Sequence, residues 1–269
     1  MKKSSYRHRA FLFAVAIVLL ATPLASAQSP FDGTWRTNPD EAPPSDTPVR
    51  YLLQDGVYQC KACNAEGQVK ADGKDYPIPP TPAYDTINIT EASLSSVEIR
   101  DKKDGRTKVD SVMAVSADGK TMTEKVVNYF LSSQPLITET TFTRLAEGPA
   151  GANLISGSWR TVKTQPDERT LITTFKSNGD GLDMSTPLGN SYSAKFDGKS
   201  YPAVAALANV ENTVSLKLIS DHTFEETRKV GDTLTIVRTF TVSEDGKKMT
   251  IVTKNLRTGA GGTSVAYKQ

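Results

Sequence analysis

The chain states one pattern twice, and this repetition limits its architecture more than any single motif does. Gly33–Thr37 reads Gly-Thr-Trp-Arg-Thr, and Gly157–Thr161 reads Gly-Ser-Trp-Arg-Thr, with the only two tryptophans. Two further landmarks recur in the same order: Asp-Gly-Lys-x-Tyr-Pro at residues 72–77 and 197–202, and Asp-Gly-Lys-x-Met-Thr at residues 118–123 and 245–250. The offsets of 124, 125 and 127 residues are nearly constant, which indicates a duplicated domain.

The N-terminal residues predict a cleaved secretory signal. Four basic side chains precede the apolar run of residues 10–21, and Ala25-Ser26-Ala27 supplies small residues for a signal peptidase. The apolar run is short for a membrane span, and no cysteine follows it to carry a lipid. We therefore expect residues 1–27 to be removed and the protein to be exported, to the periplasm or the medium.

The chain without that signal has 28 basic and 30 acidic residues. Because no basic block remains, neither nucleic acid nor an anionic membrane is an expected partner. The remaining length is enough for two domains, each with its own core. The predicted boundaries are 28–147 for the first repeat, 148–153 for a Gly- and Pro-containing linker, and 154–269 for the second repeat.

Short segments rich in Val, Ile, Thr and Tyr alternate with Gly, Asp and Asn pairs, and no helical periodicity competes with them. The predicted strands are residues 49–54, 57–60, 85–90, 96–101, 107–116, 120–130 and 137–145 in the first repeat, and residues 171–176, 191–196, 213–219, 223–229, 233–242, 247–255 and 263–268 in the second. Sequential short strands with tight turns predict an all-β fold of two antiparallel up-and-down barrels, with a two-sheet sandwich as the alternative.

The two Asp-Gly turns allow the strand register to be predicted. If Asp118-Gly119 and Asp245-Gly246 are two-residue type I′ loops, Val242 pairs with Met249 and each further pair follows by counting. The face with most of the large apolar groups is then the inward one. This assignment places two charged residues, Glu124 and Arg238, in inward columns.

These residues resemble a known superfamily. Gly-x-Trp at the start of a first strand, followed by a meander of about 115 residues, is similar to the lipocalin and fatty-acid-binding barrels. The tandem form, with its repeated landmarks, resembles secreted bacterial proteins of undetermined function. The resemblance implies that Trp35 and Trp159 are structural and pack across the closed end of a barrel, against a basic residue of the last strand such as Arg144.

The chain departs from the fatty-acid-binding pattern in two places. A proline-rich loop at residues 37–48 replaces a helical lid, and the last strands, reading Thr143-Arg144-Leu145 and Ala266-Tyr267-Lys268, lack the Arg-x-Tyr anchor. A fatty-acid ligand is therefore not carried over from the resemblance.

The only cysteines are Cys60 and Cys63. A thioredoxin-type pair needs a helix N-terminus, and a structural zinc site needs further Cys or His ligands, of which the chain after the signal offers only His222. In an exported protein the pair favours a disulfide, with a redox pair and a metal half-site as alternatives.

No arrangement of residues points to catalysis, a metal or a cofactor, since His222 lies in a predicted turn and no nucleophile has a base. The candidate ligand contacts are the inward residues Arg238, Phe240, Met249, Ile251, Glu124 and Met113. Arg238 must meet an internal carboxylate, a wet barrel mouth or the head group of an acidic amphipathic ligand, because a guanidinium keeps its charge when buried.

We interpret the charge runs at residues 101–104 and 225–229 as solvated strand ends. The predicted function is non-enzymatic binding of a small apolar or amphipathic molecule in one or both barrels. The alternative is a structural or protein-interaction module of the cell envelope with filled barrels.

Overall fold

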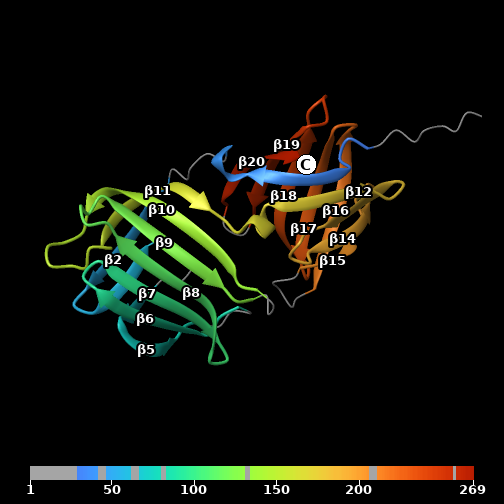
Figure 1. The fold of residues 1–269 in the computed structure, drawn as a ribbon. Coiled ribbons are helices and arrows are strands. Elements are labelled where there is room, and N and C mark those ends of the chain that lie inside the picture. Colours follow the sequence, from blue (N-terminus) through green and yellow to red (C-terminus); the bar gives the residue numbers. More distant parts are fainter. Residues whose placement is uncertain are drawn as a thin grey trace, which may run out of the picture.

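The computed structural model describes residues 29–41, 47–61, 67–79, 83–130, 134–205, 211–256 and 259–269. Within them the chain is all-β and forms two antiparallel ten-stranded barrels (Figure 1), which confirms the predicted fold class. The predicted signal peptide and Cys63 lie outside the described residues.

Barrel 1 is formed by ten strands that are contiguous in sequence. They are β2 (Val49–Gln54), β3 (Val57–Lys61), β4 (Gln68–Lys70), β5 (Asp72–Pro77), β6 (Thr86–Ser93), β7 (Ser96–Lys103), β8 (Arg106–Val115), β9 (Thr121–Asn128), β10 (Leu136–Glu147) and β11 (Gly157–Gln165). Each strand pairs with its sequence neighbour, β11 pairs back to β2, and the sheet stays open only between β4 and β5.

Barrel 2 is closed and takes its strands from both ends of the chain. They are β1 (Gly33–Asn38), β12 (Ile172–Ser177), β13 (Gly181–Ser185), β14 (Ser191–Lys195), β15 (Tyr201–Val204), β16 (Asn212–Ser220), β17 (Thr223–Val230), β18 (Thr233–Val242), β19 (Lys248–Asn255) and β20 (Gly261–Lys268). In barrel 2 the strands that correspond to β4 and β5 are β14 and β15, and these two strands are paired.

The two repeats exchange their Gly-x-Trp strands. β1, from the first repeat, pairs with β12 and β20, whereas β11, from the second repeat, pairs with β10 and β2. The chain passes between the barrels after β1 and again after β11, and a short 3-10 helix follows each crossing strand: η1 (Pro39–Glu41) and η2 (Glu168–Thr170). In Figure 1 the blue β1 accordingly lies among the orange and red strands.

This exchange corrects the predicted domain boundaries. The predicted linker 148–153 joins β10 to β11 within barrel 1 and is tied to it. The backbone N–H of Asn153 donates to the carbonyl of Leu53, and its side-chain amide donates to Glu91 Oε1 and to the carbonyl of Ser93. A segment held by these bonds, with Asn153 only 4% exposed, is part of the barrel wall and not a free connection.

All fourteen predicted strands are present, with ends that differ by at most three residues. β1 and β11 are the strands that the Gly-x-Trp motif was expected to begin, and four further strands, β4, β5, β13 and β15, were not predicted. Of these four, β4 has only three residues, β13 begins with glycine, and the other two contain a proline, Pro77 or Pro202, that is atypical of a central strand.

The predicted register is confirmed, although the turn type behind it is wrong. Val242 pairs with Met249 and Val115 with Met122, as counted. Asp118 and Asp245 do not have the positive φ that a type I′ turn requires, and each loop instead has four residues, with the carbonyl of Ser116 or Ser243 accepting the N–H of the loop glycine. Two-residue and four-residue loops centred on the same dipeptide give the same pairing. The type I′ geometry is found at Asp55-Gly56 and Asp104-Gly105.

The Gly-x-Trp motif builds the same closed end in each barrel. Trp35 and Trp159 are at most 1% exposed, and each indole N–H donates to a carbonyl four residues earlier, that of Phe31 or Ile155, at 2.8 Å. The glycines have φ near +125° to +129°, and a Cβ on Gly157 would collide with the carbonyl oxygen of Ala146.

A basic residue of the last strand lies over each tryptophan ring. The guanidinium of Arg144 is 4.0 Å from the centroid of Trp159, and the ammonium of Lys268 is 5.1 Å from that of Trp35. Arg144 thus contacts a tryptophan, as the resemblance implied. That tryptophan is Trp159, which belongs to the second repeat and lies in barrel 1 because of the strand exchange.

The Asp-Gly-Lys-x-Tyr-Pro motif forms the same local hydrogen bonds in both repeats. Asp72 accepts hydrogen bonds from the Tyr76 hydroxyl and the Lys74 backbone N–H, and Asp197 does the same with Tyr201 and Lys199. The repeated residues therefore shape turns and closed ends.

Candidate functional site

Barrel 2 is packed at one end and hollow at the other. Trp35, Phe224, Val242 and Met249 fill the packed end. Above them lies a cavity of about 410 Å³. Its lining is mixed polar and apolar and comes from β1, β12, β13, the turn after β13, and β17 to β20: Thr37, Thr173, Phe175, Met184, Thr186, Asn190, Glu226, Arg228, Arg238, Phe240, Ile251, Thr253 and Ser264.

Two arginines converge on one buried carboxylate in this cavity. Arg228 donates from Nε to Glu226 Oε1 at 2.7 Å and from Nη2 to Oε2 at 3.3 Å, and Arg238 donates from Nη1 to Oε1 at 3.1 Å. The Glu226 side chain is 1% exposed, whereas those of Arg228 and Arg238 are 19% and 31% exposed. The carboxylate therefore lies deep, and the guanidinium groups face the hollow.

The electrostatics of this group are set by the arginines. Burial alone would raise the pKa of Glu226, but the charges of Arg228 and Arg238 outweigh burial and hold that pKa below its ordinary value. With Glu226 ionised, the three side chains sum to one positive charge. Tyr192, whose ring lies 5.6 Å from the Arg228 guanidinium, is buried beside Glu226, and burial followed by the charge of Glu226 raises its pKa.

The structure brings together three of the predicted ligand residues. Arg238 points inward as predicted and lines the cavity with Phe240 and Ile251. Its internal carboxylate, one of the alternatives from the sequence, is Glu226. Met249 is fully buried in the packed end below the cavity.

Sequence reasoning missed Glu226 and Arg228, and the interpretation of residues 225–229 as a solvated strand end is wrong. Phe224, Glu226 and Arg228 alternate along β17, so all three share the inward face with a core phenylalanine. The alternation can be read from the sequence, but the charged residues of this segment made the whole of it look exposed to solvent. Thr37 was missed because the strand exchange brings it into barrel 2.

The other two predicted ligand residues lie in barrel 1. Met113 is 1% exposed in its core, and Glu124 pairs with it across β8 and β9. Burial raises the pKa of Glu124. Asp101 was taken for a solvated strand end, but it shares the inward face of β7 with Val97 and Ile99, and burial raises its pKa as well.

Cys60 is buried in the core of barrel 1. Because its predicted partner, Cys63, is outside the described residues, the disulfide stays a prediction.

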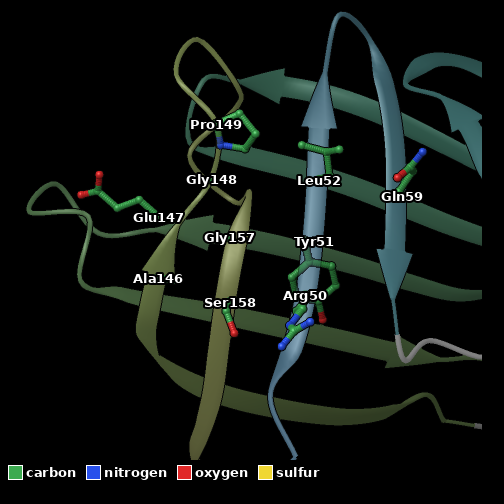
Figure 2. Close-up of a pocket in the computed structure, with 10 residues that line it drawn as sticks. All are labelled: Arg50, Tyr51, Leu52, Gln59, Ala146, Glu147, Gly148, Pro149, Gly157 and Ser158. Carbon is green, nitrogen blue, oxygen red and sulfur yellow. The ribbon is translucent and has the colours of Figure 1, made fainter.

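Figure 2 shows a second hollow, of about 300 Å³, at barrel 1. It is bordered by Arg50 of β2, Gln59 of β3, Glu147 at the end of β10, and Pro149 in the turn after it. Its two charged residues, Arg50 and Glu147, are exposed and of opposite sign. The cavity of barrel 2 is the better candidate site, because its carboxylate is buried and its charges do not cancel.

In the described part of the chain, no group of three or more His, Cys, Asp or Glu side chains is placed to hold a metal ion. The described residues also contain no helix that is long and apolar enough to cross a membrane.

Comparison with known proteins leaves the chain without an assigned family: no family model matches it, and a search of curated proteins finds no significant match.

Proposed function

We propose that this chain is an exported, non-enzymatic binding protein that holds a small acidic, amphipathic molecule in barrel 2, in the manner of a lipocalin-like barrel. The observation that carries the proposal is the excess positive charge of a cavity of about 410 Å³, a size in the range of small-molecule sites.

The donors of Arg238 support an anionic ligand. Among the described residues this guanidinium uses only Nη1, toward Glu226, which leaves Nε and Nη2 for a carboxylate, sulfonate or phosphate group. Arg228 is held by two bonds to Glu226 and acts as a fixed charge beside it.

The apolar part of the lining suits an apolar tail. Phe175, Phe240 and Ile251 line the cavity, and the first two meet edge to face at 5.6 Å between ring centroids. Hydroxyl groups of Thr37, Thr253 and Ser264 add hydrogen-bonding capacity. A ligand with one anionic head and a short apolar body fits both parts.

The test compares three probes of equal chain length, octanoate, octylamine and octanol, by titration calorimetry of the full-length protein. We expect octanoate to bind one site more tightly than octanol. Arg238→Met keeps the bulk, removes the charge, and should weaken octanoate binding by about tenfold to 150-fold, which corresponds to about 1.5–3 kcal/mol for a charged hydrogen bond, while octanol binding stays unchanged.

Arg160→Met is the matched control, because Arg160 is exposed on the outside of β11. The proposal fails if octanoate binds neither protein or binds both variants as tightly as the wild type. In either case the structural module with filled barrels becomes the better explanation. Native mass spectrometry of protein purified from its own host would show a retained ligand as added mass.

A further inference from the structure

The ion group in the cavity of barrel 2 has two guanidinium groups for one carboxylate, and the hydrogen bonds show how they share it. Arg228 donates from Nε and Nη2 to the two carboxylate oxygens of Glu226, at 2.7 and 3.3 Å. Arg238 donates to the same carboxylate only from Nη1, at 3.1 Å, so its Nε and Nη2 bond to no described residue. Nε and Nη2 form one edge of the planar guanidinium, which matches two oxygens of one acid group. The internal carboxylate thus leaves one guanidinium edge for an external acid.

The charges of the cavity lining sum to a single positive charge. Of the described residues that line the cavity, only Glu226, Arg228 and Arg238 are charged. A bound acid with one negative charge brings the sum to zero. A dianion makes it negative, and no other described residue of the lining carries a balancing positive charge. The cost of removing water from an ion rises with the square of its charge, whereas its attraction to a fixed site rises only in proportion, so the second charge is a net penalty.

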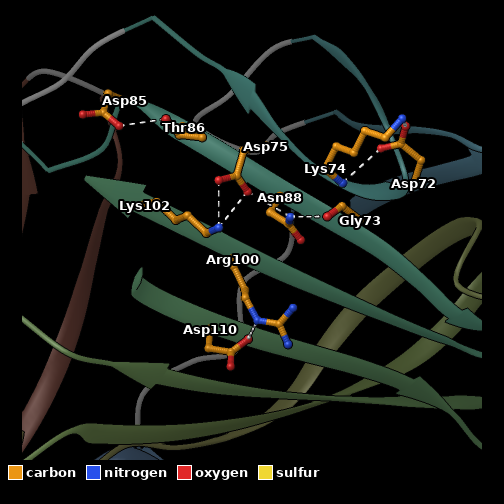
Figure 3. Close-up of polar contacts among 10 residues, drawn as sticks. All are labelled: Asp72, Gly73, Lys74, Asp75, Asp85, Thr86, Asn88, Arg100, Lys102 and Asp110. Carbon is orange, nitrogen blue, oxygen red and sulfur yellow. Dashed lines mark hydrogen bonds and ion pairs between the residues drawn. The ribbon is translucent and has the colours of Figure 1, made fainter. Parts of the chain in front are cut away.

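Burial makes this charge balance matter in barrel 2. The Glu226 side chain is 1% exposed, and the two arginines face the cavity, so a ligand that fills the cavity removes their water. The outer face of barrel 1 differs. There Arg100 lies 2.7 Å from Glu98 and 3.5 Å from Asp110, and Figure 3 shows the second of these contacts. One cation faces two carboxylates at that place, but bulk water and salt screen the surplus charge at the surface.

We propose that Glu226 sets the charge of the acid that barrel 2 accepts: the site takes singly charged acids, such as carboxylates and sulfonates, and discriminates against dianions such as phosphate monoesters. This inference rests on the proposed function and narrows its ligand class. Glu226 acts through Arg228 and Arg238, as a positioning residue that cancels one of their two charges. Its loss should therefore change the preference between ligands and not only their affinity.

The first test uses the wild-type, full-length protein and two probes with the same tail and three terminal oxygens each, octanesulfonate and octyl phosphate. A sulfonate keeps one negative charge, whereas a phosphate monoester gains its second charge near pH 6. Titration calorimetry gives the affinity of each probe at about pH 5 and about pH 8. We expect the affinity of octyl phosphate relative to octanesulfonate to fall by about tenfold over this range, and the sulfonate corrects for any titration of the protein.

The second test changes the charge of the site. Glu226→Gln keeps the shape and adds one positive charge to the lining, so at about pH 8 the affinity of octyl phosphate relative to octanesulfonate should rise by about tenfold over the wild type. Glu225→Gln is the matched control, because Glu225 lies on the outer face of the same strand, between Lys217 and Thr239 of the neighbouring strands. It should leave the ratio unchanged. Circular dichroism checks the fold of each variant, and the wild-type comparison holds even if Glu226→Gln does not fold.

The outcomes separate this inference from the proposed function. If neither acid binds the wild type, or if octanol binds as tightly as octanesulfonate, the proposed function fails and the charge selection with it. If octanesulfonate binds and Arg238→Met weakens it, but the wild-type ratio stays constant or rises between the two pH values, only the charge selection is wrong. Equal losses of both probes in a folded Glu226→Gln protein would also overturn it, because they would assign Glu226 a purely structural role.

Discussion

The two barrels share a scaffold and differ in their interiors. Both have an indole bonded to a carbonyl four residues earlier, a basic side chain over that indole, and an Asp-Tyr bond at a corner. Above that closed end, barrel 2 carries two arginines around Glu226. Barrel 1 carries Glu124 and Asp101, and within the described residues neither forms an ion pair. The residues that recur between the repeats therefore specify the fold, and the residues that differ set the charge of each interior.

The exchange of Gly-x-Trp strands makes the barrels unequal in a second way. Barrel 1 is continuous in sequence from β2 to β11, while barrel 2 needs β1 from the other end of the chain. A chain that begins at Pro48 should thus keep barrel 1 and lose the cooperative folding of barrel 2, because β12 and β20 become open edges. This is the largest effect that we expect.

The measurement uses two-dimensional NMR of the truncated chain, in which barrel 1 amides should stay dispersed and barrel 2 amides should collapse. A synthetic peptide of residues 29–41 should restore the lost signals. A chain of residues 47–165 should fold alone. If truncation disrupts barrel 1 instead, each repeat closes its own barrel and the exchange is incorrect.

The next largest effect concerns the charges in barrel 2. Glu226→Gln leaves Arg228 and Arg238 without their buried counter-charge and should lower the free energy of unfolding by about 3 kcal/mol, since breaking a buried ion pair from one side costs more than removing both partners. Urea denaturation followed by Trp35 fluorescence in a Trp159→Phe background reports on barrel 2.

Two further variants sharpen that result. Adding Arg238→Met to Glu226→Gln should recover part of the loss, because one uncompensated charge disappears. Glu225→Gln, on the outer face of the same strand, should change stability by less than about 0.5 kcal/mol. Equal losses for Glu225→Gln and Glu226→Gln would contradict the buried ion group.

A smaller difference separates the two closed ends. Arg144 lies over Trp159 and also donates to the carbonyls of Ser156 and Leu154, at 2.8 and 2.6 Å, whereas Lys268 lies more distantly over Trp35. Arg144→Met should destabilise barrel 1 by about 2 kcal/mol, and Lys268→Met should destabilise barrel 2 by about 0.5 kcal/mol. Urea denaturation tests this order, with the fluorescence of Trp159 reporting on Arg144→Met and that of Trp35 on Lys268→Met. Equal losses in the free energy of unfolding would show that the hydrogen bonds from Arg144 to the two carbonyls add no stability.

The sequence was sufficient for the scaffold because its signals are local. Fourteen strands followed from alternation and turn residues, and the register of Val242 with Met249 survived a wrong turn type because both loop lengths preserve it. The strand exchange could not be predicted. β1 and β11 carry the same landmark, so local sequence does not decide which barrel each one closes; that depends on how far the connecting segments reach.

The site was predicted in part, for a related reason. Arg238, Phe240 and Ile251 followed from counting across one hairpin. Glu226 and Arg228 lie on the neighbouring β17, which the Gly231-Asp232 turn joins to β18. A β-bulge next to Arg228 shifts the register by one residue, so counting from that turn pairs Glu226 with Val237, and their charge suggested solvent. Only the paired strands show that Glu226 lies opposite Arg238.

The last and smallest effect is a pH response of opposite sign in the two barrels. Glu226 has a folded-state pKa below its ordinary value of 4.5, so its contribution to stability is present above pH 4.5 and is lost as pH falls through the folded pKa. Burial raises the pKa of Glu124 and Asp101 above their ordinary 4.5 and 3.8, so their contribution is present at lower pH and is lost as pH rises through the folded values.

Raising the pH from about 3 to 7 should therefore stabilise barrel 2 relative to barrel 1. Exposed carboxylates with lowered pKa, such as Asp118 and Asp245, occur at matching places in both barrels and largely cancel in the comparison. Urea denaturation across this range would follow Trp159 in a Trp35→Phe protein for barrel 1 and Trp35 in a Trp159→Phe protein for barrel 2. Glu124→Gln with Asp101→Asn should remove the loss in barrel 1 at higher pH and leave the profile of barrel 2 unchanged. Parallel profiles in the two single-tryptophan proteins would mean that the interior carboxyls are solvated alike, and the electrostatic contrast between the barrels would have to be abandoned.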